Sequence, residues 1–240
     1  MDSSIDPDLT SLPDVSFIVP AAGKGLRMGG GVAKQYLLVN GKPILQHTLE
    51  RLVALQPDKI ILVVSADDKQ WASIEATQQC CIVIGGETRS DSVLNGLNAL
   101  DGEASDWVMV HDCVRPCVRA GDINRLHNDL KLSTVGGLLG LPVIETLKKV
   151  SDHRDVVKTV LREEHWLAQT PQMFRLGLLQ SALQQAKSDG WNVTDEASAI
   201  EMSGQTPIII QGSKDNIKIT TTEDLALAEY FLQQQSYEQP

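Results

Sequence analysis

The chain has 240 residues, of which 42% are hydrophobic and 22% are charged, and this length and composition are typical of one folded domain rather than a disordered chain. Its 31 acidic residues outnumber its 21 basic residues, giving a net charge of −10, so its overall field argues against a nucleic-acid partner. No apolar run in the sequence approaches the roughly 18 residues needed to cross a bilayer, which argues against a membrane protein.

The amino-terminal segment and the cysteines bear on the cellular compartment. Residues 1–14 hold four aspartates and no Lys or Arg, unlike a secretory signal or an Arg-rich transit peptide. The four cysteines, two adjacent and two spaced by three residues, do not form the pattern of a secreted disulfide framework. We therefore expect a disordered leader over residues 1–14, reduced thiols and a cytoplasmic location.

Strand and helix patterns alternate through residues 15–141. Continuously apolar or β-branched runs predict strands at 15–19, 59–64, 80–84, 107–110 and 134–141. Apolar residues at helical spacing predict helices near 43–55, 91–100 and 122–132. The alternation predicts an α/β fold of Rossmann-like type, with an open, mostly parallel sheet flanked by helices, in a single domain over residues 15–240.

The pattern changes after residue 142. Residues 143–160 alternate polar and apolar side chains on both sides of a turn-prone stretch at 151–155, which predicts a protruding β-hairpin arm over about 143–164. The apolar face of such an arm needs a partner surface. Beyond the arm, the sequence predicts a strand at 207–210 and helices near 176–187, 195–202 and 222–233.

A glycine-rich segment directly after the first predicted strand is the strongest chemical signal. Residues 20–28 read PAAGKGLRM, and their small side chains let backbone N–H groups approach an anion closely. Lys24, Arg27 and Lys34 add positive charge. Because open α/β sheets bind ligands at the carboxyl ends of their strands, we expect a phosphate-binding loop here.

Two common phosphate-binding motifs do not account for this segment. A Walker A loop needs Ser or Thr after its Gly-Lys pair, whereas the pair at 41–42 is followed by Pro43. The dinucleotide-binding fingerprint needs a third glycine where Met28 stands and an acidic residue after the second strand, which ends at Val64. A different class of nucleotide-binding loop is therefore favoured.

Five sequence blocks, taken in order, carry a resemblance to a known family. They are PAAGKGLRM with KQY at 34–36, GGETRSDSV at 85–93, HDCVRP at 111–116, TDEAS at 194–198 and DNIKIT at 215–220. Together they resemble the sugar-phosphate nucleotidylyltransferases, and in detail the 2-C-methyl-D-erythritol 4-phosphate cytidylyltransferase family of the non-mevalonate isoprenoid pathway. The resemblance covers nearly the whole chain after residue 14.

The resemblance implies a reaction between CTP and 2-C-methyl-D-erythritol 4-phosphate, hereafter methylerythritol phosphate. An acceptor phosphate oxygen attacks the α-phosphorus of CTP, pyrophosphate leaves, and a CDP-linked product forms. Negative charge grows on the α-phosphate, so fixed cations serve better than a general base. The resemblance assigns this catalytic role to Arg27 and Lys34. It assigns nucleotide binding to Pro20, Ala21, Ala22, Gly23, Gly25, Gly85, Gly86, Glu87 and Ser92.

A divalent cation and an acceptor site are implied in the same way. Asp112 matches the family's metal-associated aspartate and Asp215 is a second candidate, and Mg²⁺, or another divalent cation, suits a carboxylate facing a triphosphate. The implied acceptor-binding residues are Asp112, Arg115, Thr146, Arg162, Thr170 and Lys218. In the family the arm reaches the neighbouring subunit, which implies a homodimer with shared active sites.

Other interpretations are open at this stage. Asp112 could cap the loop that follows it, whereas His111, Cys113 and Cys117 lack the ligand number and spacing of a zinc site. Ribitol 5-phosphate cytidylyltransferases share the glycine-rich loop and the block around Asp112, and a non-catalytic nucleotide sensor could use the same fold. Conversion of CTP with each acceptor distinguishes these functions.

Overall fold

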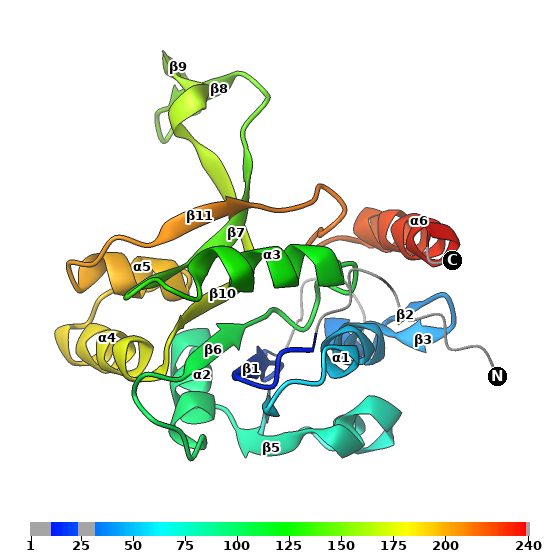
Figure 1. Cartoon of the computed structure of the whole chain (residues 1–240). Coiled ribbons are helices and arrows are strands. Elements are labelled where there is room, and N and C mark those ends of the chain that lie inside the picture. Colours follow the sequence, from blue (N-terminus) through cyan, green and yellow to red (C-terminus); the bar gives the residue numbers. More distant parts are fainter. Residues whose placement is uncertain (1–10, 24–31, 239–240) are drawn as a thin grey trace.

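A computed structural model of the protein describes residues 11–23 and 32–238, and it is organised around one central sheet (Figure 1). Among these residues, seven strands form the sheet in the order β11-β7-β10-β6-β1-β4-β5. They are β1 (Val15–Pro20), β4 (Lys59–Val64), β5 (Cys81–Ile84), β6 (Trp107–Val110), β7 (Gly136–Pro142), β10 (Trp166–Arg175) and β11 (Ile208–Gln211). Neighbouring strands are parallel except at β10, which runs antiparallel to β6 and β7. The predicted mostly parallel α/β sheet is confirmed.

Strand β10 was not predicted from the sequence. Its pairing with β7 shifts register between Ala168 and Gln172, and the intervening Gln169 and Thr170 are buried polar residues. A buried polar stretch lacks the apolar pattern by which strands are recognised in a sequence. The strand therefore becomes visible only from its pairing with two neighbours.

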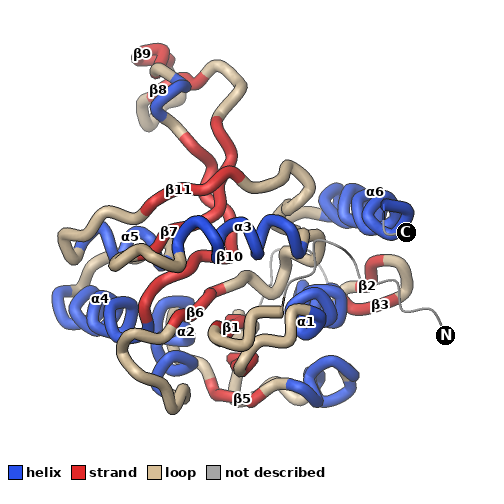
Figure 2. Tube along the Cα trace, viewed as in Figure 1, coloured by secondary structure: helices blue, strands red, loops and turns tan. Residues whose placement is uncertain are grey.

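Helices cover both faces of the sheet (Figure 2). They are α1 (Ile44–Ala54), α2 (Arg89–Asn98), α3 (Ala120–Leu130), α4 (Leu176–Asp189), α5 (Glu196–Met202) and α6 (Thr222–Glu238). Phe17 and Leu62 belong to the core shared with α1 and α3, whereas Ile18 and Val63 belong to the core shared with α2, α4 and α5. Successive side chains of a strand point to opposite faces, so burial of both faces explains why the runs at 15–19 and 59–64 are apolar except at Ser16 and Lys59.

Smaller elements complete the fold. A short hairpin joins β2 (Leu38–Val39) to β3 (Lys42–Pro43), and α6 packs over it through Ala228 and Leu232. Short 3-10 helices occupy Lys34–Tyr36, Gln70–Ser73, Glu75–Gln79 and Arg162–Glu164. Within the described ranges, no helix is both long and apolar enough to span a membrane.

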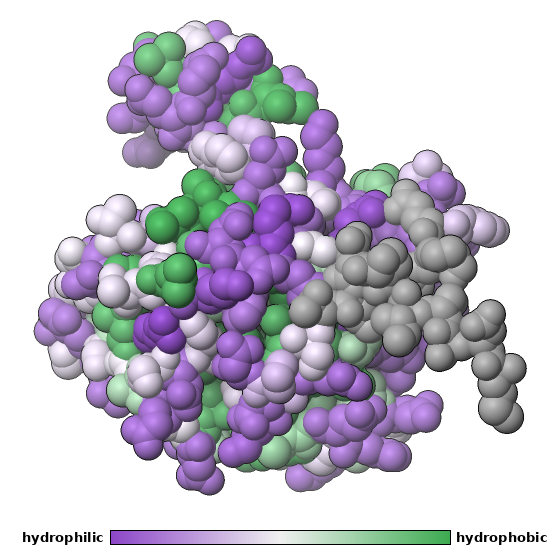
Figure 3. Space-filling view, in the orientation of Figure 1, coloured by the Kyte–Doolittle hydropathy of each residue, from purple (hydrophilic) through white to green (hydrophobic). Residues whose placement is uncertain are grey.

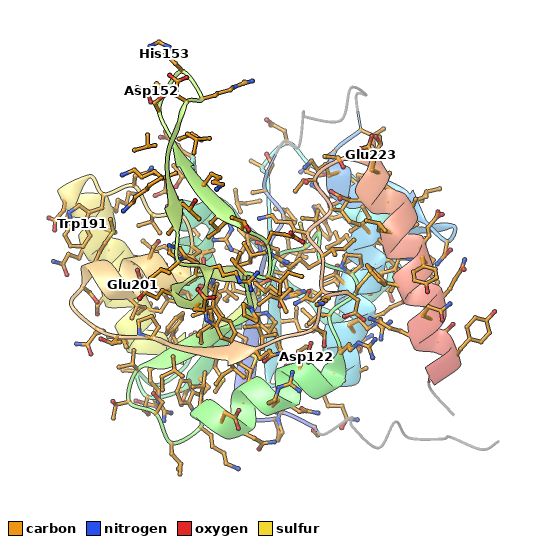
Figure 4. All side chains as sticks on the ribbon, turned by 90° about the horizontal axis from the view of Figure 1, so that it is seen from above. Asp122, Asp152, His153, Trp191, Glu201 and Glu223 are labelled. Atoms are coloured by element: carbon orange, nitrogen blue, oxygen red, sulfur yellow. The ribbon has the colours of Figure 1, made fainter. Side chains whose placement is uncertain are left out.

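The predicted hairpin arm is confirmed. Strands β8 (Leu147–Val150) and β9 (Val156–Val160) pair antiparallel and project beyond the sheet (Figure 1), with Asp152 and His153 at the tip (Figure 4). Several apolar side chains of the arm are exposed, Leu161 by 67%, and apolar patches interrupt its otherwise hydrophilic surface (Figure 3). The arm thus exposes apolar surface that a single chain leaves uncovered.

The folded domain begins earlier than the predicted boundary at residue 15. Leu12 is 2% exposed and its N–H donates to the Leu55 carbonyl at 2.8 Å. Asp14 Oδ2 lies 3.3 Å from His127 Nε2. The sequence indicates a leader there because residues 1–14 hold four aspartates, and a single buried apolar side chain among them forms no strand or helix pattern. Residues 1–10 of the predicted leader lie outside the described residues.

Candidate functional site

The carboxyl ends of β1, β4, β5 and β6 open onto one cavity of about 710 Å³. These strands are parallel neighbours, so the segments that follow them meet at one edge of the sheet. The residues that line the cavity are Pro20, Ala21, Ala22, Gly23, Lys34, Gln35, Ser65, Ala66, Gly85, Gly86, Glu87, Thr88, Arg89, Ser92, Asp112, Cys113, Val114 and Lys218. The cavity therefore brings together predicted nucleotide-binding residues from two blocks with Lys34, Asp112 and Lys218.

The first side of the cavity is the segment after β1 together with the 3-10 helix Lys34–Tyr36. The Ala21 N–H donates to the Val63 carbonyl at 2.7 Å, and Gln35 Nε2 donates to the Ala21 carbonyl at 3.0 Å. Lys34 Nζ donates to the Thr220 carbonyl at 3.1 Å. These bonds hold the Lys34 ammonium group beside the loop.

Part of the predicted phosphate-binding loop is not described. Pro20, Ala21, Ala22 and Gly23 line the cavity, whereas Gly25 and Arg27 lie outside the described residues, as does Lys24. For Lys24, Gly25 and Arg27, the expected place in a phosphate-binding loop therefore rests on the sequence alone.

The second side of the cavity is the turn that joins β5 to α2. A Cβ atom added to Gly85 would lie 2.7 Å from both Ala22 Cβ and Ser92 Oγ, so glycine allows the turn to approach the loop after β1. The Gly86 N–H donates to Ser92 Oγ at 3.1 Å, and the Ser92 hydroxyl donates to the Thr88 carbonyl at 2.9 Å. Ser92 thus shapes the turn while it lines the cavity.

Asp112, which follows β6, lies at the centre of a charged cluster. Arg89 Nη2 lies 3.1 Å from its Oδ1, and Lys218 Nζ and Arg115 Nε lie 2.9 and 3.6 Å from its Oδ2. Burial by itself would raise the pKa of the Asp112 carboxyl group, but the charges of Arg89, Lys218 and Arg115 hold it well below its ordinary value. Asp112 is therefore a carboxylate at neutral pH.

A hydrogen-bonded chain fixes the backbone of Asp112. Thr170 Oγ1 accepts from the Asp112 N–H at 3.1 Å and lies 3.0 Å from His111 Nδ1, while His111 Nε2 lies 3.2 Å from the Arg115 carbonyl. Burial lowers the pKa of His111 to about 4, so the ring is neutral at pH 7. A carbonyl only accepts, so Nε2 carries the proton and Nδ1 accepts from the Thr170 hydroxyl.

A second pocket of about 250 Å³ adjoins the cavity and shares Arg89, Asp112 and Lys218 with it. Arg115 and Thr170, two predicted acceptor-binding residues, line this pocket. A ligand there would face a nucleotide across the Asp112 cluster. This arrangement suits two substrates that react with each other, one in each pocket.

Three predicted site residues lie elsewhere. Thr146 and Arg162 are exposed on the arm, where Arg162 Nη1 donates to the Ile144 carbonyl at 2.5 Å, and neither lines the cavity of the same chain. Asp215 lies beside α6, with Oδ2 2.6 Å from Arg119 Nη2 and 2.9 Å from Gln235 Nε2. The single chain therefore does not bring these three side chains into its own cavity.

Arg89, Gln35 and Glu196 contribute to the site but were not identified from the sequence. Arg89 and Glu196 lie inside two of the quoted blocks, where a basic residue at the start of one helix and an acidic residue at the start of another were available as a signal. Glu196 Oε1 lies 2.6 Å from Arg89 Nη1. Nothing in the sequence spacing pairs residues that are 107 positions apart.

The cavity fits a divalent cation that arrives with a substrate. Across residues 11–23 and 32–238, no three His, Cys, Asp or Glu side chains group closely enough to hold a metal ion by themselves. Asp112 offers a buried carboxylate at the cavity wall, and Mg²⁺ commonly binds one or two carboxylates and completes its shell with phosphate oxygens and water.

A family model, curated proteins and a crystal structure that share one description are similar to this chain. Residues 15–234 match the family model described as 2-C-methyl-D-erythritol 4-phosphate cytidylyltransferase. A curated protein of that name from Hahella chejuensis is 48% identical over 220 residues, covering 90% of this chain and 91% of the relative. One from Aliivibrio fischeri is 42% identical over 234 residues, covering 96% of this chain and 98% of the relative. The crystal structure of the Francisella tularensis protein of that name superposes with a TM-score of 0.78 at 41% identity, covering 90% of this chain and 99% of that chain.

Proposed function

This chain belongs to the 2-C-methyl-D-erythritol 4-phosphate cytidylyltransferase family, and from that membership we propose how the residues of its cavity act. The protein is a nucleotidyltransferase that joins CTP and methylerythritol phosphate in isoprenoid precursor synthesis. The observation that carries the assignment of roles is the meeting of the loop after β1, Lys34 and Asp112 in one cavity.

Lys34 and Arg27 stabilise the transition state at the α-phosphate. Attack by the acceptor phosphate concentrates negative charge on the non-bridging oxygens, and a cation held in place there lowers the barrier without a change of protonation. The support for Lys34 is its place in the cavity wall and its anchored ammonium group. Arg27 is assigned by the family resemblance, because it lies outside the described residues.

The nucleotide lies against the loop after β1 and the Gly85–Gly86 turn. Backbone N–H groups of the loop suit the triphosphate, and the backbone groups of the turn, with Glu87 and Ser92, suit the edge of the base. Cytosine presents an amine that needs an acceptor where uracil presents an oxygen. Acceptors in this turn would therefore favour CTP over UTP.

A divalent cation completes the nucleotide site. Enzymes of this family are nucleotidyltransferases that generally use divalent cations, and we assign Mg²⁺ to Asp112, the buried carboxylate of the cavity wall. When bound, the cation offsets the negative charge of the triphosphate. Asp215 stays a prediction as a second ligand, since its Oδ2 pairs with Arg119.

Methylerythritol phosphate occupies the pocket that adjoins the cavity. Lys218 and Arg115 offer positive charge to its phosphate, and Thr170 holds the backbone of Asp112 between the two pockets. In this structure Lys218 pairs with Asp112. When the cation binds Asp112, it replaces Lys218 at that carboxylate, and the ammonium group of Lys218 can turn to the acceptor phosphate.

The protein acts as a homodimer in which each arm completes the site of the other subunit. The exposed apolar side chains of the arm and the absence of Thr146 and Arg162 from the cavity of their own chain support this arrangement. We test it by co-expressing Lys34→Ala and Arg162→Ala chains, each inactive alone. Shared sites predict that the mixture recovers roughly a quarter of wild-type activity, because random pairing makes about half of the dimers mixed and half of the sites in each mixed dimer are intact. No recovery in mixed dimers would assign Arg162 to its own subunit.

One assay tests the proposed acceptor. CTP and Mg²⁺ are mixed with methylerythritol phosphate or ribitol 5-phosphate, and pyrophosphate release is measured. Release with methylerythritol phosphate alone is expected. Release with ribitol 5-phosphate alone would identify the other cytidylyltransferase, and release with neither would favour a nucleotide sensor. A cytoplasmic location and the lack of a nucleic-acid partner stay predictions from the sequence.

A further inference from the structure

Arg89, the first residue of α2, bridges two buried carboxylates at the edge of the cavity. Its Nη1 lies 2.6 Å from Glu196 Oε1 and its Nη2 lies 3.2 Å from Glu196 Oε2. On the other side, Nε and Nη2 lie 3.3 and 3.1 Å from Asp112 Oδ1. Although burial disfavours its charge, Glu196 and Asp112 raise the pKa of Arg89 above its ordinary value. The guanidinium group is therefore a fixed positive charge shared between two acids.

Glu196 is buried, lines neither the cavity nor the adjoining pocket, and follows a capped helix start whose neighbouring residues are hydrogen-bonded. It is 1% exposed and is absent from the residues that line the cavity and the adjoining pocket. It begins α5, where Asp195 caps the helix together with Ser198. Gln172 of β10 bonds both to Asp195 Oδ2 and to the Ala197 N–H, each at 2.8 Å. Among the described residues, Arg89 is the side chain that links Glu196 to Asp112 and the cavity.

The charges around Asp112 indicate that Glu196 favours the binding of a cation there. Among the described residues, three basic side chains contact the Asp112 carboxylate, and each one opposes the binding of another cation there. Glu196 offsets the charge of one of them, Arg89. Without that offset, the full charge of Arg89 would act on Asp112 alone.

We propose that Glu196 is a positioning residue that, through Arg89, sets the affinity of Asp112 for the divalent cation. The inference rests on the proposed role of Asp112 as the metal ligand. It adds a determinant of metal binding that lies behind the site and touches neither substrate.

The test measures Mn²⁺ binding directly, by electron paramagnetic resonance, to the protein saturated with a CTP analogue whose α,β-bridging oxygen is a methylene group. Glu196→Gln keeps the size of the side chain and removes its charge. We expect it to weaken Mn²⁺ binding by about tenfold or more, as partners behind a metal ligand commonly do. The matched control is Glu201→Gln on the same helix, an exposed acid labelled in Figure 4, which we expect to leave Mn²⁺ binding unchanged.

A double variant, Arg89→Gln with Glu196→Gln, provides the second measurement. It removes both charges together and leaves neither partner buried without its counter-charge, so it also serves if Glu196→Gln alone does not fold. Since the net charge around Asp112 is then restored, we expect Mn²⁺ affinity close to that of the wild type. A folded Glu196→Gln variant with unchanged Mn²⁺ affinity would overturn the inference. A folded double variant whose Mn²⁺ affinity is about tenfold or more below that of the wild type would also overturn it. If the wild-type complex binds no Mn²⁺, the assignment of the metal to Asp112 fails instead.

Discussion

The buried ring of His111 makes the stability of the protein depend on pH in a defined window. Its pKa is lowered from 6.5 to about 4 by burial, so between these values the unfolded chain binds a proton that the folded chain does not. The stability linked to the neutral ring is thus fully present above pH 6.5 and is lost as pH falls toward 4. At about 1.4 kcal/mol for each unit, the displacement corresponds to about 3 kcal/mol of unfolding free energy.

The assay compares urea unfolding of the wild type and His111→Gln from pH 7.5 to 4, with a chelator present so that no metal contributes. A glutamine can donate to the Arg115 carbonyl and accept from Thr170, as His111 does, but it does not titrate. The depressed pKa values of Asp112 and His47 act in both proteins. The difference between the two pH profiles therefore isolates His111.

We expect His111→Gln to lose about 3 kcal/mol less than the wild type between pH 6.5 and 4. His127→Gln, which removes a partly exposed histidine on α3, controls for the loss of a histidine as such. Parallel profiles for wild type and His111→Gln would refute the reasoning, because they would show that the ring titrates alike in folded and unfolded chains.

Three further predictions concern the cavity. Lys34→Ala is expected to lower kcat at least about a hundredfold, since one fixed charge at the transition state contributes about 3 kcal/mol; steady-state kinetics and an unchanged circular dichroism spectrum check it. Gly86→Ala would place a Cβ 2.4 Å from Asp91 Cβ, so the turn must shift; we expect a loss of about 1–3 kcal/mol in thermal unfolding and a raised KM for CTP. Lys218→Met is expected to raise KM for methylerythritol phosphate about tenfold with a smaller change for CTP, and equal changes for both substrates would contradict its place in the acceptor pocket.

Local sequence patterns were sufficient for much of the sheet and for one wall of the site. The runs at 15–19 and 59–64 are apolar except at Ser16 and Lys59, because both faces of β1 and β4 are buried, and this signal needs no knowledge of the partners. The glycine-rich segment after β1 was also predicted from local sequence, because the strand, the loop and its small residues are neighbours in the chain. Gly85 and Gly86 were also identified, although the close approach that requires Gly85, to Ala22, is a tertiary contact.

The family resemblance grouped Arg115, Thr170 and Lys218 with Asp112, but only the tertiary structure decided how they contact it and added Arg89 and Glu196. Strand β10 is buried yet polar at Gln169 and Thr170, so its position depends on pairing with β6 and β7 rather than on its own pattern. That pairing sets Thr170 against the Asp112 N–H, and the helices on the α2 face bring Glu196 to Arg89. Hydrophobic periodicity predicts which face of a helix or strand is buried, but it does not predict which distant side chain pairs with a charged residue on that face. The sequence therefore determined where the cavity opens and several of its charged residues, and only the packed sheet and helices determined how those charges pair within it.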